Sequence, residues 1–213
     1  MPNANMVPTM LNCRTLFLSD VHLGCKDCQA DYLLAFLQRS QADTIYLLGD
    51  IVDLWAMRKQ VHWKAGQNTI VRCLLDKAEQ GTEIVYIPGN HDEALRLYAG
   101  KSFGNIRIAL RASHTTAQGK KLLLLHGDEF DKEVNFGRLH AWLGDNLYDL
   151  LLFLNRWYNR LRRLTGGNYF SLAAYIKSKV PGAQKAIARY RDAVIAKAKR
   201  GGFDGVVCGH IHH

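Results

Sequence analysis

The sequence predicts an α/β fold, in which short apolar strands alternate with amphipathic helices. Several runs of four or five apolar residues stop abruptly at a turn, as residues 84–87 stop at Pro88-Gly89. Apolar residues at helical spacing fill much of the chain between these runs, as expected for helices that cover a sheet. Polar, chemically reactive side chains come directly after the strands, at the sheet edge where open α/β sheets build their active sites.

The expected elements succeed one another without an internal repeat or a low-complexity linker. After a loose lead-in over residues 1–14, apolar runs predict strands at 15–19, 44–48, 84–87, 106–110, 115–118, 122–125 and 203–208. Helical spacing predicts helices over about 31–39, 68–80, 138–164 and 171–200, and Gly81 stands where a glycine would end the second of them. The length of 213 residues is that of one domain spanning residues 1–213.

Five of the predicted strands end in residues that carry chemistry. A lone histidine or Gly-Asp after a strand is usually part of an ordinary turn, but parallel strands would bring all these side chains to one rim. These candidate site residues are Asp20, His22, Asp50, Asn90, His91, His126, His210 and His212.

Seven of these side chains suit metal ions. Two Asp, one Asn and four His offer oxygen and nitrogen donors without a thiolate, which favours Mn²⁺, with Fe or Zn²⁺ as alternatives. Seven ligands are too many for one ion but suit two ions that share a carboxylate, a pair that can clamp both oxygens of a displacement at phosphorus. The spacing His210-x-His212 on an extended segment would point both rings the same way.

The positive charge of the chain is concentrated in one segment. The net charge is +9, and residues 151–200 hold twelve Lys/Arg but a single acid, a net charge of +11. This segment is expected to face an anionic partner or a charged interface.

The cysteines and the N-terminus predict a cytosolic protein with reduced thiols. The five cysteines include one Cys25-x-x-Cys28 pair, but no second pair completes a zinc site. The N-terminus lacks the pattern of a signal peptide, and no stretch approaches the roughly 18 apolar residues of a membrane span.

Five motifs, in this order, resemble the calcineurin-like metallophosphoesterase family over nearly the whole chain. They are Asp20-Val-His22, Gly49-Asp50, Gly89-Asn90-His91-Asp92, His126-Gly-Asp128 and Gly209-His210-Ile-His212. The resemblance implies a four-layer α/β/β/α sandwich that holds two divalent metal ions.

The same resemblance implies a role for each site residue. One ion would be held by Asp20, His22, Asp50 and His212, and the other by Asp50, Asn90, His126 and His210, so that Asp50 bridges them. A hydroxide between the ions would be the nucleophile. His91 would stabilise the phosphorane and help to protonate the leaving oxygen, and Asp92 would orient His91.

A narrower resemblance is to the UDP-2,3-diacylglucosamine hydrolases. It is carried by residues 19–24, by Gly49-Asp-Ile-Val-Asp-Leu-Trp55 and by a helical insertion after His126, here at about 138–200. It implies cleavage of the pyrophosphate of a lipid-linked nucleotide sugar in lipid A biosynthesis, by a cytoplasmic protein peripheral to the inner membrane. Those enzymes typically have Arg where this chain has His91, so the sequence also fits a sister group with a different phosphoester.

The insertion contains an amphipathic helix over residues 142–164, which carries arginines opposite its apolar face. One interpretation is an ordinary core-packing helix with a solvated basic side. The run of five apolar residues at 150–154 favours the other, in which the apolar face lines a slot for acyl chains. Arg156, Arg160 and Arg163 are then the expected substrate-binding residues, in contact with phosphate or anionic lipid.

Three other functions are weighed against this hydrolase. The same metals could serve a phosphodiesterase or phosphomonoesterase acting on nucleotides. A nuclease would use the basic segment, but long aliphatic side chains rather than stacking aromatics interrupt it, so nucleic acid is not the expected partner. A non-catalytic scaffold is disfavoured because every ligand position is filled, and no obligate protein partner is predicted.

Overall fold

The computed structural model describes residues 10–131, 158, 162 and 181–211. The chain divides into two compact units, one formed by residues 1–126 and 203–210 and the other by residues 127–202 and 211–213. The first unit contains both β-sheets.

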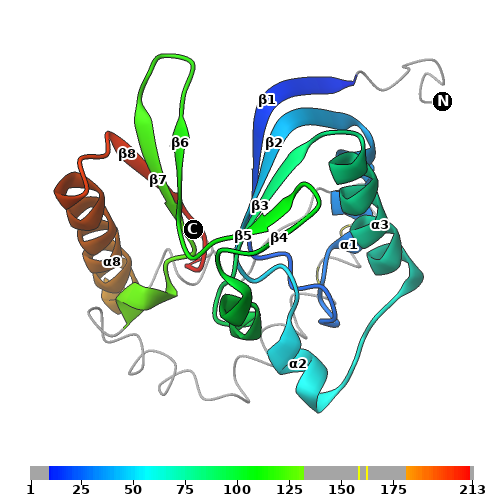
Figure 1. The fold of residues 1–213 in the computed structure, drawn as a ribbon. Coiled ribbons are helices and arrows are strands. Elements are labelled where there is room, and N and C mark those ends of the chain that lie inside the picture. Colours follow the sequence, from blue (N-terminus) through cyan, green and yellow to red (C-terminus); the bar gives the residue numbers. More distant parts are fainter. Residues whose placement is uncertain (1–9, 132–157, 159–161, 163–180, 212–213) are drawn as a thin grey trace. The chain divides into compact units, whose positions relative to one another are not determined.

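The first unit contains eight strands, three α-helices and one 3₁₀ helix among its described residues (Figure 1). In chain order they are β1 (Leu11–Leu18), α1 (Ala30–Gln38), β2 (Ser40–Leu48), α2 (Leu54–Lys59), α3 (Ala65–Glu79), β3 (Glu83–Ile87), η1 (Glu93–Tyr98), β4 (Ser102–Phe103), β5 (Ile106–Ile108), β6 (Ala112–Thr115), β7 (Lys121–Leu125) and β8 (Gly205–Cys208). They build a five-stranded sheet of order β1-β2-β3-β5-β4 and a three-stranded sheet of order β6-β7-β8.

The parallel strands of each sheet end on the same rim. β1, β2, β3 and β5 are parallel, as are β7 and β8, so their carboxyl ends point the same way within each sheet. Two hydrogen bonds join the rims of the two sheets: the His210 N–H donates to the Asp20 carboxylate at 3.1 Å, and His126 Nδ1 faces the carbonyl oxygen of Leu48 at 2.8 Å. This arrangement gathers residues from both sheets around one place.

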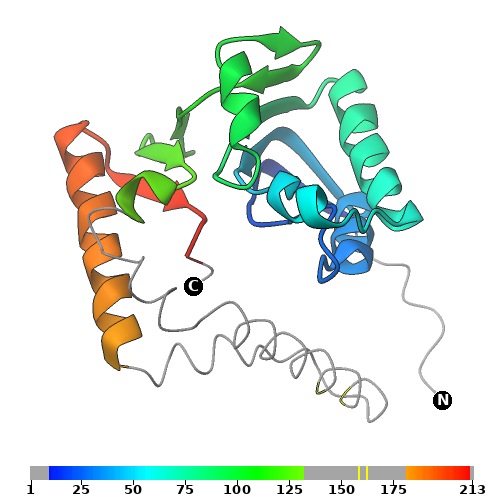
Figure 2. The same cartoon turned by 90° about the horizontal axis from the view of Figure 1, so that it is seen from below.

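Two apolar cores hold the layers of this unit together. One core packs the buried faces of α1 and α3, including Leu37 and Ile70, against the strands of the larger sheet (Figure 2). The second core contains Leu48 and Ile87 from the larger sheet and Leu124 from the smaller one. The helices α1 and α3, the larger sheet and the smaller sheet therefore form successive layers. This arrangement confirms the expected mixed α/β fold with two sheets.

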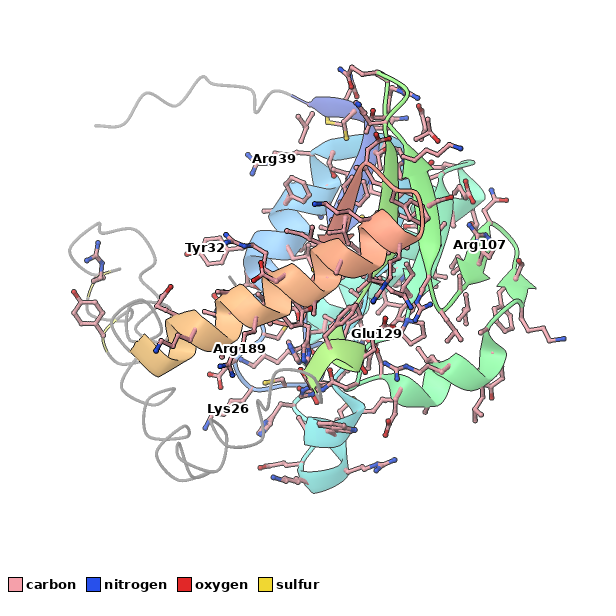
Figure 3. The ribbon with its side chains drawn as sticks, turned by 90° about the vertical axis from the view of Figure 1, so that its left-hand side faces the viewer. Lys26, Tyr32, Arg39, Arg107, Glu129 and Arg189 are labelled. Carbon is pink, nitrogen blue, oxygen red and sulfur yellow. The ribbon has the colours of Figure 1, made fainter. Side chains whose placement is uncertain are left out.

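The second unit is described at η2 (Asp128–Phe130), at Tyr158 and Arg162, and at α8 (Pro181–Arg200). α8 buries Tyr190, Val194 and Ala198 at four-residue spacing, and the Phe130 ring packs edge-on against Tyr190 at 5.9 Å. The opposite side exposes basic residues, of which Arg189 projects outward from the helix (Figure 3).

Most expected elements lie where the sequence places them, but some bounds differ and some short elements, such as β4 and η2, were not expected. β1 begins at Leu11, inside the expected loose lead-in. β6 spans Ala112–Thr115 rather than 115–118, because Gly119 turns back from Thr116 with an amide hydrogen bond of 2.9 Å. α2 and η1 were not expected, because each has only six residues and shows little periodicity. Of the predicted helix at 138–164 only Tyr158 and Arg162 are described, both helical, and α8 matches the later part of the one at 171–200.

Candidate metal centre

The backbone takes an unusual conformation where the strands end. Asp20, His22, Asp50 and His210 all have positive φ angles, of 54°, 53°, 53° and 74°. This left-handed conformation costs a residue with a Cβ about 1–3 kcal/mol and persists only where the surroundings enforce it. The φ angle also shows that the segment at His210 bends and is not extended as expected, and His212 lies outside the described residues.

One carboxylate oxygen stands at the middle of the rim. Asp50 Oδ2 lies 3.3 Å from His126 Nε2, and 4.0 Å from the Nε2 atoms of both His22 and His91. The other oxygen, Oδ1, accepts the backbone N–H of His91 at 2.8 Å. Because Asp50 is only 2% exposed, this carboxylate is fixed among three imidazoles with one edge turned toward them.

The proton positions on these imidazoles depend on their outer partners. His126 Nδ1 faces the carbonyl oxygen of Leu48 at 2.8 Å, and a carbonyl can only accept, so Nδ1 carries the proton. Asp53 faces two rings at once, with Oδ2 at 3.0 Å from His22 Nδ1 and Oδ1 at 2.9 Å from His91 Nδ1. In the neutral form all three rings therefore turn an unprotonated Nε2 toward Asp50, as metal-ligating histidines do.

The remaining candidate ligands, Asp20, Asn90 and His210, lie where the rims of the two sheets meet. The Asp20 carboxylate accepts the backbone N–H of His210 at 3.1 and 3.2 Å, and also the hydroxyl of Ser19 at 2.5 Å. Asn90 Oδ1 lies 3.2 Å from His126 Nε2, so both atoms converge on one point. The structure thus brings together every described residue that the strand endings predicted.

The spacing of donor atoms fits two ions that share one ligand. In each of two groups the candidate ligand atoms lie within 4.8 Å of one another, and Asp50 belongs to both. These groups are His22, Asp50 and His91, and Asp50, His126 and His210. Imidazole and carboxylate donors around a common carboxylate suit a pair of borderline divalent ions. The residues present are therefore chemically suited to hold two such ions.

Glycines leave room for this packing. A Cβ built on Gly89 would overlap Asp50 Oδ1 and the His126 ring, and a Cβ on Gly209 would overlap the side chains of Ser19 and Asp20. Only a residue without a side chain permits so close an approach of backbone to ligand groups.

Asp92 is not the residue that orients His91. Its carboxylate is fully buried and is occupied by five donors: the backbone N–H groups of Gly89, Asp50, Ile51 and Val52 at 2.6, 3.3, 2.8 and 3.4 Å, and the Tyr86 hydroxyl at 2.5 Å. The hydrogen bond to the His91 ring comes from Asp53 instead. Asp92 therefore ties the turn after β2 to the end of β3, and the expectation from sequence is corrected on this point.

The carboxylates and imidazoles shift one another's pKa values. Burial alone would raise the pKa of Asp50, but the hydrogen bond and charge of His126 bring it below the ordinary value. Burial would likewise lower the pKa values of His126 and His91, but Asp50 facing the first and Asp53 facing the second raise both of them. The site therefore favours anionic carboxylates beside rings that bind positive charge readily.

Sequence reasoning missed the contribution of the segment after Asp50. Asp53 was seen only as a member of the motif Gly49-Asp-Ile-Val-Asp-Leu-Trp55, although a carboxylate in an apolar run just before a helix is a signal of a capping residue. Trp55 lies two residues further on, and its ring lies 4.6 Å from the ring of His91.

Four of the expected site residues lie outside the described residues. They are His212 and the candidate substrate-binding residues Arg156, Arg160 and Arg163.

A mostly parallel α/β sheet packed on a second sheet, with Asp, Asn and His at the strand ends, is typical of metal-dependent phosphoesterases. The chain matches the family of calcineurin-like phosphoesterases over residues 13–213, and it belongs to that family.

Individual relatives resemble shorter parts of the chain. It is 32% identical over 121 residues to the UDP-2,3-diacylglucosamine hydrolase of Porphyromonas gingivalis, an alignment that covers 53% of this chain and 45% of the relative. It is 28% identical over 155 residues to the enzyme of the same name from Psychromonas ingrahamii, covering 66% and 58%. The chain thus spans about half the length of the curated relatives it matches.

The nuclease MPE of Pseudomonas putida is a solved structure with a slight likeness, at 21% identity and a TM-score of 0.29, covering 45% of this chain and 47% of the nuclease. Among the described helices, none has the length and apolarity needed to cross a bilayer.

Proposed function

We propose that the chain is a two-metal hydrolase that cleaves the pyrophosphate of UDP-2,3-diacylglucosamine or of a related lipid-linked UDP-sugar. The observation that carries this proposal is the buried Asp50 carboxylate, which two groups of candidate ligands share. The family supports the hydrolysis of a phosphoester, and the names of the curated relatives support the substrate.

In this proposal the metal ligands are distributed as the family resemblance implies. Asp20, His22, Asp50 and His212 hold one ion, and Asp50, Asn90, His126 and His210 hold the other. Two divalent ions, Mn²⁺ with Fe or Zn²⁺ as alternatives, would supply a water of lowered pKa and positive charge beside the phosphoryl oxygens.

The residues of the chain itself position and move the protons. Leu48 and Asp53 hold the Nδ1 protons of the imidazoles, so the Nε2 atoms stay available toward Asp50. When His91 binds a second proton at Nε2, the adjacent Asp53 stabilises the imidazolium, and this proton is then available to the leaving oxygen. Asp92 contributes by holding the turn that carries Asp50.

In this proposal the substrate lies at the cytoplasmic surface of the inner membrane, with its phosphates held by Arg156, Arg160 and Arg163. The exposed basic residues of α8, such as Lys185, Arg189 and Arg191, would add to an anionic binding surface. A nucleotide phosphodiesterase with the same metals is the competing function, because His91 stands where the lipid A hydrolases typically have Arg.

The test compares UDP-2,3-diacylglucosamine, bis-p-nitrophenyl phosphate and single-stranded DNA as substrates of metal-stripped protein resupplied with Mn²⁺, Fe²⁺ or Zn²⁺. We expect metal-dependent release of UMP from the first. Asp50→Asn should lower kcat about a thousandfold or more, because a shared ligand is lost. Asp43→Asn, at an exposed carboxylate earlier on β2, is the matched control and should leave kcat unchanged.

Two results would contradict the proposal. Full activity in Asp50→Asn would refute the shared carboxylate, and turnover of the diester or of DNA without UMP release would replace the lipid-linked substrate by a nucleotide or nucleic acid.

A further inference from the structure

A large aromatic side chain stands half-exposed beside the metal centre. Trp55 lies in the first turn of α2, and its ring is tilted by 35° against the His91 ring at 4.6 Å. The residue is nevertheless 42% exposed, so much of its surface is not used in covering His91. His22 contacts the same imidazole edge-on, at 4.7 Å and 90°. An indole therefore borders the place where His91 would act.

The backbone and a side chain fix this position. Asp53 caps α2, because its Oδ1 accepts the N–H of Ala56 at 2.8 Å while the same carboxylate faces His91. The N–H of Leu54 also donates to the His91 carbonyl at 3.1 Å. Both ties attach the first turn of α2 to His91, so Trp55 moves with the imidazole. Figure 1 shows α2 beyond the carboxyl ends of β2 and β3.

The position of Trp55, more than its exposure, points to a role in binding. Exposed large apolar side chains occur elsewhere in the described part of the chain, as at Leu97 and Phe103, but the half-open ring of Trp55 also contacts an imidazole of the site. Indoles left partly open beside a polar site are typical of surfaces that bind ring-shaped groups, because the flat face stacks on bases and on other rings.

We propose that Trp55 determines specificity by stacking on a ring of the phosphoester substrate. This inference rests on the proposed hydrolase function and adds the binding group for the organic part of the substrate. Because the two rings are 4.6 Å apart, a group attached to a phosphorus beside His91 would lie within reach of the indole. The ligand is a ring with a flat face, which a UDP-sugar offers as its base or as its pyranose.

The test uses three p-nitrophenyl phosphodiesters that share one leaving group and differ in the second ester. These are thymidine 5′-(p-nitrophenyl phosphate), the glucose 1-(p-nitrophenyl phosphate) diester and methyl p-nitrophenyl phosphate. The nucleoside and glucose arms separate the two sources of a ring, and the methyl ester has none. Each is measured with the wild-type protein, Trp55→Leu, Trp55→Phe and, as a matched control at an exposed aromatic residue of edge strand β4, Phe103→Leu.

The expected result is selective. Trp55→Leu should raise KM for one of the two ring-bearing esters about 5- to 100-fold more than for the methyl ester, the range of one stacking contact. Trp55→Phe keeps a ring and should retain most of the affinity, and Phe103→Leu should change none of the three.

Equal losses on all three esters, or no loss, would overturn the inference, because Trp55 would then act through His91 alone or not at all. If the wild-type protein with Mn²⁺ releases UMP from UDP-2,3-diacylglucosamine but hydrolyses none of the esters, the inference fails and the proposed function stands. If it hydrolyses neither kind of substrate, both fail. Normal hydrolysis with an unselective Trp55→Leu variant separates failure of the inference from failure of the function.

Discussion

Asp92 offers the sharpest test of how the fold holds the metal centre. Its buried carboxylate accepts four backbone N–H groups and the Tyr86 hydroxyl. In Asp92→Asn an NH₂ group replaces one of the oxygens, so at least two of the five donors lose their acceptor. Since hydrogen bonds to a charged group contribute about 1.5–3 kcal/mol each, the variant should lose about 3–6 kcal/mol of unfolding free energy.

The variant Tyr86→Phe should cause a smaller loss of unfolding free energy. Tyr86→Phe removes one donor and leaves the carboxylate its four backbone partners, so the expected loss is about 1.5 kcal/mol. Tyr46→Phe is the control, because Tyr46 is a buried tyrosine on the neighbouring strand β2, where its ring stacks on Phe17 at 5.3 Å. It should lose less than Tyr86→Phe.

Two measurements check this reasoning. Urea unfolding monitored by far-UV circular dichroism reports the free energy, and hydrogen exchange reports the local effect. Exchange should accelerate most at the amides of Ile51 and Gly89, which have the shortest backbone hydrogen bonds to Asp92. Unfolding of Asp92→Asn at the same urea concentration as the wild-type protein, with unchanged protection of these amides, would refute this role of Asp92.

Three further outcomes are expected. Asp53→Asn should weaken Mn²⁺ binding or lower kcat about 10- to 100-fold, because the NH₂ group that replaces one oxygen cannot accept the Nδ1 proton of the imidazole it faces. Calorimetry and kinetics check this prediction, and unchanged values would contradict it. Gly89→Ala should abolish tight Mn²⁺ binding, because the new Cβ overlaps the Asp50 carboxylate; a bound stoichiometry equal to that of the wild-type protein would contradict it. The N–H of Lys121, at 2.8 Å, lowers the pKa of Asp204, so the stability that this carboxylate contributes is complete above the ordinary pKa of 3.8 and is lost as the pH falls through the lowered value. Asp204→Asn should therefore lose less melting temperature than the wild-type protein as the pH falls through this range, and identical losses would refute the assignment.

The strand endings were the part of the site that sequence could predict. Buried strands leave strong apolar runs, and the residues directly after each run must lie at the sheet rim, so Asp50 and His126 could be placed without coordinates. The hydrogen-bond partners of each side chain at the rim could not be predicted in this way, because a shift of a few ångströms in a turn changes them. Asp92 was misassigned for this reason: adjacent in sequence to His91, it turns toward the backbone of a different strand end.

Asp53 and α2 were beyond a sequence argument for another reason. A six-residue helix has too few positions to show periodicity, and a capping carboxylate looks the same whether or not it also serves two imidazoles. The two imidazole partners of Asp53 come from the loops after β1 and β3, which only the tertiary fold brings to the start of α2.

The double use of Asp53 has a physical consequence for the whole centre. One carboxylate caps α2, holds the His22 ring and holds the His91 ring, so the helix that carries Trp55 and two imidazoles share a single anchor. Its pKa is lowered because the hydrogen bonds from His22 and His91 outweigh the cost of burial, and the anchor therefore remains anionic. Asp92 provides the corresponding anchor for the backbone of Asp50, whose left-handed conformation needs enforcement. The buried carboxylates of Asp53 and Asp92 thus fix the orientation of the candidate metal ligands and of His91. A substitution of either carboxylate should therefore disturb several of these groups together rather than one.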